Sequence, residues 1–407
     1  MAISNITSPV MNTPVLAYRP IIYKYSSDDV NIVHTIAEVL VNGVRISART
    51  VMPDLGTTDE FTLDISDDVQ VNLDALLKTI DSDGYLLNDG GAKVVDVKIY
   101  EITLVGGVLV TTYDPDDANN SSYDYIYEND VVCNWTESHL DYNGFTVEDY
   151  KFINSNNGAK FLSEAPLIKD IELGANEFLG LCYPTATDLK GYKLEIKTYN
   201  SANALLNTDY INITEWDSGY ANLADIIDAV YIDMCVGTQN LINNGVSLTN
   251  VAWYTVSMVN SGSAQSEIRR FNIVGSCDTD VRFHFINKFG KQDSITLKGN
   301  KVEELQSASK IYQKALSYTY SSSARGATSF DNTMNYNFVA YSKSIGRDMI
   351  KFASAMLLNN NAYVEIDGAY YPIVINTDSK VIVNEKNMPV QFQINYSFAN
   401  PTKGIRG

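Results

Sequence analysis

The chain has 407 residues, and its 49 acidic side chains outnumber 30 basic ones, which gives a formal net charge of −19. Because 45% of the residues are hydrophobic and only 19% are charged, the composition excludes a disordered polyelectrolyte. No stretch approaches the roughly 18 consecutive apolar residues of a membrane-spanning helix, so we expect no membrane insertion. At about 100–200 residues per domain, the length predicts several domains, and the 27 Tyr residues favour β-sheets over helix bundles.

The charge is unevenly distributed along the chain. Residues 1–130 carry −14, residues 131–283 carry −10 and residues 284–407 carry +5. An acidic surface repels the phosphates of nucleic acid, so we expect no specific DNA or RNA binding by the first 283 residues. The spread-out lysines of the last segment suit a solvated face or a face that docks a protein.

The cysteines are isolated from one another in sequence. None of Cys133, Cys182, Cys235 and Cys277 belongs to a CxxC pair, and zinc sites and small disulfide frameworks use closer spacings. We therefore expect reduced structural thiols and no metal. The N-terminal residues lack the basic start and apolar run of a secretion signal, which predicts synthesis in a cytoplasm.

Residues 1–130 predict an N-terminal β-sandwich-like domain. Ile36–Val41 and Val44–Ser47 are extended runs joined by Asn42-Gly43, the dipeptide that best tolerates two positive φ angles, so they predict a two-residue hairpin. Phe61–Ile65 alternates apolar and polar residues as a half-buried strand does. We also predict a strand pair, Lys93–Tyr100 and Glu101–Tyr113, that turns around Gly106-Gly107, and a short helix near Leu73–Ile80.

Residues 131–283 predict a second β-sandwich-like domain. Lys193–Tyr199 alternates, and Val251–Val259 is rich in β-branched and aromatic residues, so both are expected to be strands. Leu223–Val230 fits a helix or a buried strand equally well. Ser261–Ser266 predicts a turn before a strand at Ile268–Val274.

Residues 284–407 change character and predict an α+β domain. Apolar residues recur at helical spacing from Ile345 to Leu357, which predicts one amphipathic helix at about 345–358, capped by Ser342 or Ser344. The strands expected after this helix are Ala362–Ile366, Tyr370–Asn376, Val381–Asn384 and Val390–Ala399, with turns at Asp367-Gly368 and Thr377–Ser379.

Catalytic motifs are scarce. His34, His139 and His284 have no Ser or Cys motif beside them, and the chain contains no GxSxG, HExxH or GxxxxGK[ST] sequence. We interpret the three histidines as packed or surface residues. The sequence therefore predicts no enzyme, no catalytic residue and no cofactor.

Two segments have side chains suited to ligands. Asp114–Ser122 has the carboxylate and amide oxygens that calcium prefers, but it lacks the turn glycine and the later bidentate Glu of the known loop, so we favour an ion-free loop at a domain edge. Tyr123, Tyr125 and Tyr127 alternate. They suit either a sugar-binding groove or a strand whose rings cover a sheet face or a subunit contact.

Three segments of the sequence resemble parts of a known group of proteins. The opening Ala17–Tyr23, with the strand ending at Val39–Gly43, resembles the first β domain of structural proteins from tailed phages of Bacteroidota, crAss-like phages included. Arg282–Gly290 with Asp293 is similar to the phrase with which those proteins start their last domain. The end of the chain looks like the helix-and-sheet domain from which tail-hub and tail-tube proteins build rings, in the order helix, Tyr370–Ile375, Val390–Tyr396 and Ala399-Asn400.

The resemblance implies a virion structural protein of the tail or neck, assembled in the host cytoplasm as a tail-hub, tail-tube or neck ring. Its expected partners are further copies of itself and other tail, portal or neck proteins, with DNA passing through the ring without specific binding. The implied C-terminal assembly interface comprises Ile345, Met349, Phe352, Met356, Tyr370, Tyr371, Phe392 and Tyr396. An acidic conduit is consistent with this expectation, because phosphate does not adhere to it.

Two alternatives belong to other classes of function. One is a host-surface adhesin that holds polysaccharide against the faces of Tyr123, Tyr125 and Tyr127. The other is a hydrolase of envelope glycans, for which the sequence offers no pair of catalytic carboxylates.

Overall fold

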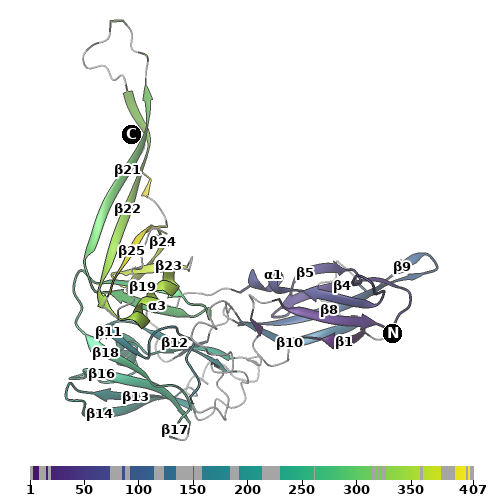
Figure 1. The fold of residues 1–407 in the computed structure, drawn as a ribbon, viewed down its shortest axis with the longest axis horizontal. Helices are drawn as coiled ribbons and strands as arrows, with labels where there is room; N and C mark the ends of the chain where they lie inside the picture. The colour runs from purple at the N-terminus through teal and green to yellow at the C-terminus, as the bar shows by residue number, and fades with distance from the viewer. Residues whose placement is uncertain are drawn as a thin grey trace. The chain divides into compact units, whose positions relative to one another are not determined.

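The computed structural model describes residues 3–8, 15–16, 20–73, 85–87, 92–113, 123–133, 150, 158–183, 192–212, 230–260, 262–313, 315, 318–319, 321, 327–357, 361–376, 390–399 and 402–403. β-strands dominate these residues, which confirms the mainly β class (Figure 1). The chain divides into two compact units. The first comprises residues 1–163, 167–274 and 287–292, and the second comprises residues 164–166, 275–286 and 293–407.

Two sheets form the N-terminal part of the first unit. The three-stranded sheet has the order β1-β3-β6, with bounds Ile3–Thr7, Ile22–Ser27 and Glu60–Asp64. The other sheet has the order β2-β10-β8-β4-β5, with bounds Val15–Leu16, Tyr125–Cys133, Ala92–Val105, Ile32–Val41 and Val44–Val51. In addition, β9 (Val108–Val110) pairs with β8, and the short helix α1 spans Ser66–Gln70.

Alternating side chains of both sheets meet in one core. β6 buries Phe61 and Leu63 and turns its neighbours outward, as its alternating sequence predicts. The side chains of both residues pack with Tyr23 and Tyr25 of β3 and with Val97 of β8. The hairpin between β4 and β5 is confirmed, since Asn42 and Gly43 form its turn at φ 50° and 75°.

The rest of the first unit is built on a second core. A six-stranded sheet has the order β11-β18-β16-β13-β14, with bounds Ile168–Glu172, Arg269–Val274, Trp253–Asn260, Tyr192–Tyr199 and Leu205–Asn212, and β17 (Ser263–Ala264) pairs with β16. A three-stranded sheet has the order β12-β15-β7, with bounds Phe178–Tyr183, Val230–Cys235 and Tyr85–Leu87. The helix α2 spans Thr238–Asn243. Leu194 and Ile196 of β13 pack there with Leu179 of β12 and Met234 of β15.

The described residues of the second unit form one eight-stranded sheet and one helix. The sheet has the order β20-β19-β23-β24-β25-β22-β21, with bounds Gln292–Leu297, Val281–Ile286, Ala362–Ile366, Ala369–Ile375, Val390–Phe398, Ala327–Ile345 and Lys301–Gln313, and β26 (Thr402–Lys403) pairs with β22. The helix α3 spans Arg347–Leu357, which confirms the helix predicted at about 345–358. Its Phe352, Ala353 and Met356 are buried against Phe283 and Phe285 of β19.

Several predicted details are wrong. Lys93–Tyr100 and the first residues of the second predicted strand form one continuous strand, β8, although the chain does turn at Gly106-Gly107. Ser342 and Ser344 lie inside β22 and not at the start of α3, where the Gly346 carbonyl accepts the Ile350 N–H. The hydroxyl of Ser342 instead accepts a hydrogen bond from the Phe392 N–H.

Both predicted domain boundaries fall within strands. The boundary after residue 130 interrupts β10, and the boundary after residue 283 interrupts β19. Other predictions fall on segments outside the described residues: the short helix after Leu73, the segment 223–229, the loop 114–122, the turn 377–379 and the strand 381–384.

Candidate assembly interface

The longest pair of strands in the second unit extends beyond the rest of its sheet (Figure 1). β21 and β22 have 13 and 19 residues, and they pair from Lys301–Ala340 to Gln313–Ala327. β22 pairs with β25 only from Asn337 onward. Among the described strands, the stretch Ala327–Phe330 therefore pairs with β21 alone. We call Lys310–Gln313 together with Ala327–Phe330 the arm.

The arm exposes apolar side chains to solvent. Ile311 is 66% exposed and Tyr312 is 59% exposed. A two-stranded ribbon is marginally stable in water, and exposed apolar groups add to the instability. β21 is also the last strand in the order of its sheet, so its outer backbone edge has no partner strand within the described chain. The arm therefore has the chemistry of a surface that another protein covers.

Charged residues lie along the same edge strand. Lys301, Glu303, Glu304 and Lys310 of β21 are exposed, and the Lys301 ammonium lies 2.7 Å from the Glu303 carboxylate. Charges on an edge strand discourage indiscriminate pairing with other strands. They leave the edge available to a partner with matching charges.

The eight residues implied as an assembly interface have different environments. Phe352, Met356, Phe392 and Tyr396 are buried in the core of the second unit, so they stabilise its fold and do not form a surface. Burial raises the pKa of the Tyr396 phenol, which keeps the ring neutral. Ile345 and Met349 pack at the edge of this core, and Tyr370 is half-buried. Tyr371 alone of the eight is exposed.

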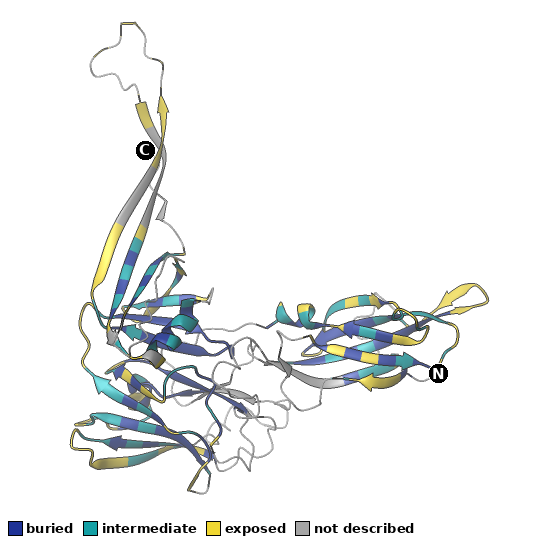
Figure 2. Cartoon of the chain, in the orientation of Figure 1, coloured by how far each residue is buried: buried dark blue, intermediate teal, exposed yellow. Residues whose placement is uncertain are grey.

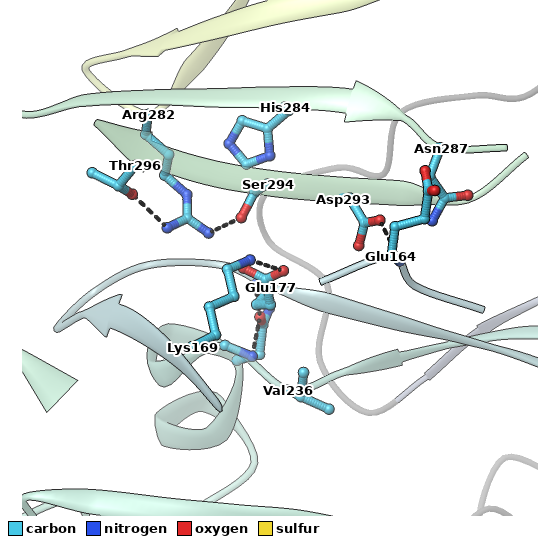
Figure 3. A network of polar contacts seen from close by, with 12 residues as sticks. Glu164, Lys169, Glu177, Val236, Arg282, His284, Asn287, Asp293, Ser294 and Thr296 are labelled. Atoms are coloured by element: carbon cyan, nitrogen blue, oxygen red, sulfur yellow. Dashed lines mark hydrogen bonds and ion pairs between the residues drawn. The ribbon is translucent and has the colours of Figure 1, made fainter. Parts of the chain in front are cut away.

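A polar cluster on the sheet of the second unit joins β20, β19 and β23. Figure 3 shows its residues on β19 and β20: Arg282, His284, Ser294 and Thr296. The Arg282 guanidinium donates to the Ser294 hydroxyl at 2.7 Å and to the Thr296 hydroxyl at 3.4 Å. One oxygen of Glu365 lies 2.8 Å from His284 Nε2 and 3.4 Å from Arg282 Nε. The residues share a face because Arg282 and His284 are two apart on β19 and each is opposite β23.

The side chains of this cluster bind one another, as structural residues do. His284 and Ser294 are buried, and the His284 ring also contacts the Tyr370 ring at 4.5 Å. The sequence predicted His284 as a packed or surface residue, and the structure shows that it is packed; its partner Glu365 was missed. The alternation Arg282-Phe283-His284-Phe285 was the available signal, because it places both polar side chains on one face. Among the described residues, no three His, Cys, Asp or Glu side chains gather as a metal site requires.

Two buried ion pairs lie in the described part of the first unit. The Lys169 ammonium is 2.6 Å from the Glu177 carboxylate (Figure 3), and the Lys291 ammonium is 3.2 Å from the Asp233 carboxylate. In the second pair the two side chains are 0% and 1% exposed. Buried charges need such partners, since an isolated one carries a large desolvation penalty.

The alternating tyrosines cover a sheet face. Tyr127 is buried, with its ring 4.6 Å from the Tyr23 ring and 4.9 Å from the Tyr125 ring. Tyr125 packs against the same core, and the Lys98 ammonium lies 5.4 Å from the Tyr123 ring. Two of the three rings are thus engaged within the sheets, which does not favour a sugar-binding groove built from their faces.

No protein-family model and no curated protein matches the chain. Among solved structures, an ICAM-5 D1-D4 ectodomain fragment is similar over 91% of this chain and 73% of its own, at 7% identity and a TM-score of 0.20. Dimeric latent PorU from Porphyromonas gingivalis is similar over 83% of this chain and 32% of its own, at 9% identity and a TM-score of 0.19. A marsupial T cell receptor matches 83% of this chain and 95% of its own, at 8% identity and a TM-score of 0.14. At these TM-scores, the likenesses carry no argument about fold or function. In the described part of the chain, no helix is long and apolar enough to cross a membrane.

Proposed function

We propose that this chain is a structural component of a tailed-phage virion, a tail-hub, tail-tube or neck protein that assembles as a multimeric ring around the DNA conduit. The observation that carries the proposal is the arm of β21 and β22, an exposed two-stranded ribbon with an open edge. Such a ribbon gains stability when a neighbouring subunit covers it. In this proposal the second unit is an α+β ring-forming domain, and the two cores of the first unit belong to β-sandwich-like domains.

The distribution of charge supports the same proposal. A surface that guides DNA without holding it must be acidic or neutral, and the first 283 residues carry a net −24 while the last 124 carry +5. Opposite charges on the two parts of one polypeptide favour contacts between different parts of neighbouring copies. The proposed partners are copies of the chain and other tail, portal or neck proteins.

Assembly of the purified full-length chain tests the proposal. We expect light scattering to show a mass that rises with protein concentration to a fixed multiple of 45.1 kDa, and negative-stain images to show rings. Mass spectrometry of purified virions should detect the chain. A chain that stays monomeric at every concentration, and that is missing from virions, contradicts the proposal. Turnover of envelope glycans by the purified chain would instead favour an enzyme.

A further inference from the structure

An apolar hairpin projects from the N-terminal sheets of the first unit (Figure 1). Gly106 and Gly107, at φ 61° and 83°, connect β8 to β9. Five apolar side chains around this turn are 46–64% exposed: Leu104, Val105, Val108, Leu109 and Val110. Figure 2 shows this hairpin in the colour of exposed residues. Residues 102–113 contain no charged side chain. We call residues 104–110 the apolar tip.

The apolar tip is exposed on both faces. Successive side chains of a strand point to opposite faces, so the exposure of Val108, Leu109 and Val110 in a row means that neither face packs on the core of the unit. The turn glycines explain the backbone conformation but not the apolar side chains beside them. Contiguous exposed apolar groups of this kind mark interaction surfaces.

Carboxylates surround the base of the hairpin. The Leu104 N–H donates to the Asn31 carbonyl at 2.9 Å, which holds the base next to the turn that carries Asp28 and Asp29. The Glu101 N–H donates to the Asp124 carboxylate at 2.7 Å. Burial raises the pKa of the Glu101 carboxyl, the hydrogen bond from Ser27 opposes this, and Asp124, Asp29 and Asp28 raise it further. We call the three aspartates that ring the base, Asp28, Asp29 and Asp124, the acidic collar.

The charge of the acidic collar indicates what kind of partner the apolar tip binds. Anionic lipid headgroups repel carboxylates at the membrane surface, so the collar opposes insertion of the tip into such a bilayer. The complementary surface has exposed apolar side chains bordered by lysines. The arm has this pattern, with exposed Lys310 beside exposed Ile311 and Tyr312 of β21.

We infer that the apolar tip of one copy binds the exposed arm residues of β21, Lys310–Tyr312, in a second copy of this chain, with the acidic collar facing Lys310. The inference rests on the proposed ring assembly and names the two surfaces that meet in it. Because these surfaces differ, the contact is heterologous, and repeated heterologous contacts close into rings or extend into filaments.

Sedimentation of full-length variants tests the inference. The double substitution Val108→Asp/Leu109→Asp places charges on the tip, and we expect it to raise the dissociation constant of assembly about tenfold or more. Ile311→Asp/Tyr312→Asp should have the same effect from the other surface. Leu55→Asp is the matched control, since Leu55 is a fully exposed apolar residue in another turn of the same sheets, and it should leave assembly unchanged. All these positions are exposed, so far-ultraviolet circular dichroism should stay that of the natural chain.

Mixing the two double variants gives a sharper readout. Each retains one intact surface, so an equimolar mixture should form dimers and nothing larger, while each variant alone stays monomeric. If the tip variant assembles like the natural chain, or the mixture yields no dimers, this inference is wrong although the ring proposal stands. A natural chain that never assembles overturns both. Tip-dependent flotation with vesicles of phosphatidylcholine, with or without phosphatidylglycerol, and unchanged assembly would identify lipid as the occupant and overturn the inference.

Discussion

Buried charge places the strongest constraint on single side chains in the first unit. Lys291 and Asp233 are fully enclosed, and Gly180 lies so close that a Cβ on it would meet the Lys291 Cγ at 2.7 Å. Neither the lysine nor the carboxylate can turn toward water from such a position. The ion pair is therefore fixed by the packing around it, and each charge depends on the other.

Removing one charge of this pair should be far more damaging than removing both. We expect Lys291→Met to lower the free energy of unfolding by about 3–5 kcal/mol, because the Asp233 carboxylate stays buried without its lysine. Lys291→Met/Asp233→Leu should recover much of that loss. The matched control is Lys301→Met, which breaks the half-exposed pair with Glu303 and should cost less than about 1 kcal/mol. Urea denaturation measures all three variants, and equal losses for the two single substitutions would contradict the expectation.

Glu101 makes the stability of the first unit depend on pH, and the direction of this dependence follows from its pKa. Burial raises its pKa above the ordinary value of 4.5, so the folded chain binds the proton more tightly than the unfolded chain does. Stability from this group is present at low pH and is lost as pH rises through the raised folded pKa. Glu101→Gln keeps an acceptor for the Ser27 hydroxyl but has no charge to bury. We expect the variant to melt at a higher temperature than the natural chain at pH 7, with the difference shrinking toward pH 4. A difference independent of pH would exclude Glu101 as its source.

At the scale of elements, the base of the β21–β22 hairpin depends on one close backbone approach. A Cβ on Gly299 would lie 2.2 Å from the Tyr341 carbonyl oxygen, which is backbone and cannot move aside alone. We expect Gly299→Ala to displace the start of β21 and to cost about 1–3 kcal/mol or more. Gly275→Ala is the control, because nothing lies within 4 Å of the added methyl group. Thermal unfolding compares the two variants, and equal melting temperatures would show that the hairpin base adapts.

Elements with local determinants were predictable from the sequence, and elements with distant ones were not. Asn42-Gly43 and Asp367-Gly368 specify their hairpins through positive φ angles, and the apolar stripe of α3 specifies a helix. The arm escaped prediction because β21 and β22 are joined through a long connection and their register depends on pairs such as Lys301 with Ala340. The Ser342 cap was wrong for the same reason, since pairing with β25 continues β22 through that residue.

The implied interface shows a related limit of sequence reasoning. Periodicity identifies Phe352 and Met356 as apolar positions on one face of a helix, and Phe392 as one on a strand. It does not tell which part of this chain or of another protein covers that face. In this chain the covering element is its own sheet or helix. Exposed apolar positions such as Leu109 and Ile311 carry no periodic signal, and only their solvent exposure distinguishes them.

For the whole molecule, the uneven charge predicts assembly that depends on salt. In the proposed assembly, attraction between the acidic residues 1–283 of one copy and the basic C-terminal residues of another is screened as the Debye length falls from about 10 Å at 0.1 M salt to about 3 Å at 1 M. We expect the dissociation constant of assembly to rise across that range in sedimentation experiments. Charge reversal at the collar, Asp28→Lys/Asp29→Lys, should weaken assembly at low salt and reduce its salt dependence. Assembly that is insensitive to salt would mean that apolar contacts alone hold the copies together.

The interleaving of the two units has a consequence for biosynthesis. Residues 287–292 belong to the first unit, but the strands on either side of them belong mainly to the second. Lys291, the partner of Asp233, lies in this short insertion. A ribosome therefore releases Lys291 only after β19 has emerged, and until then the Asp233 carboxylate lacks this lysine. We accordingly expect fragments that end before residue 291 to be less stable than the first unit of the full-length chain.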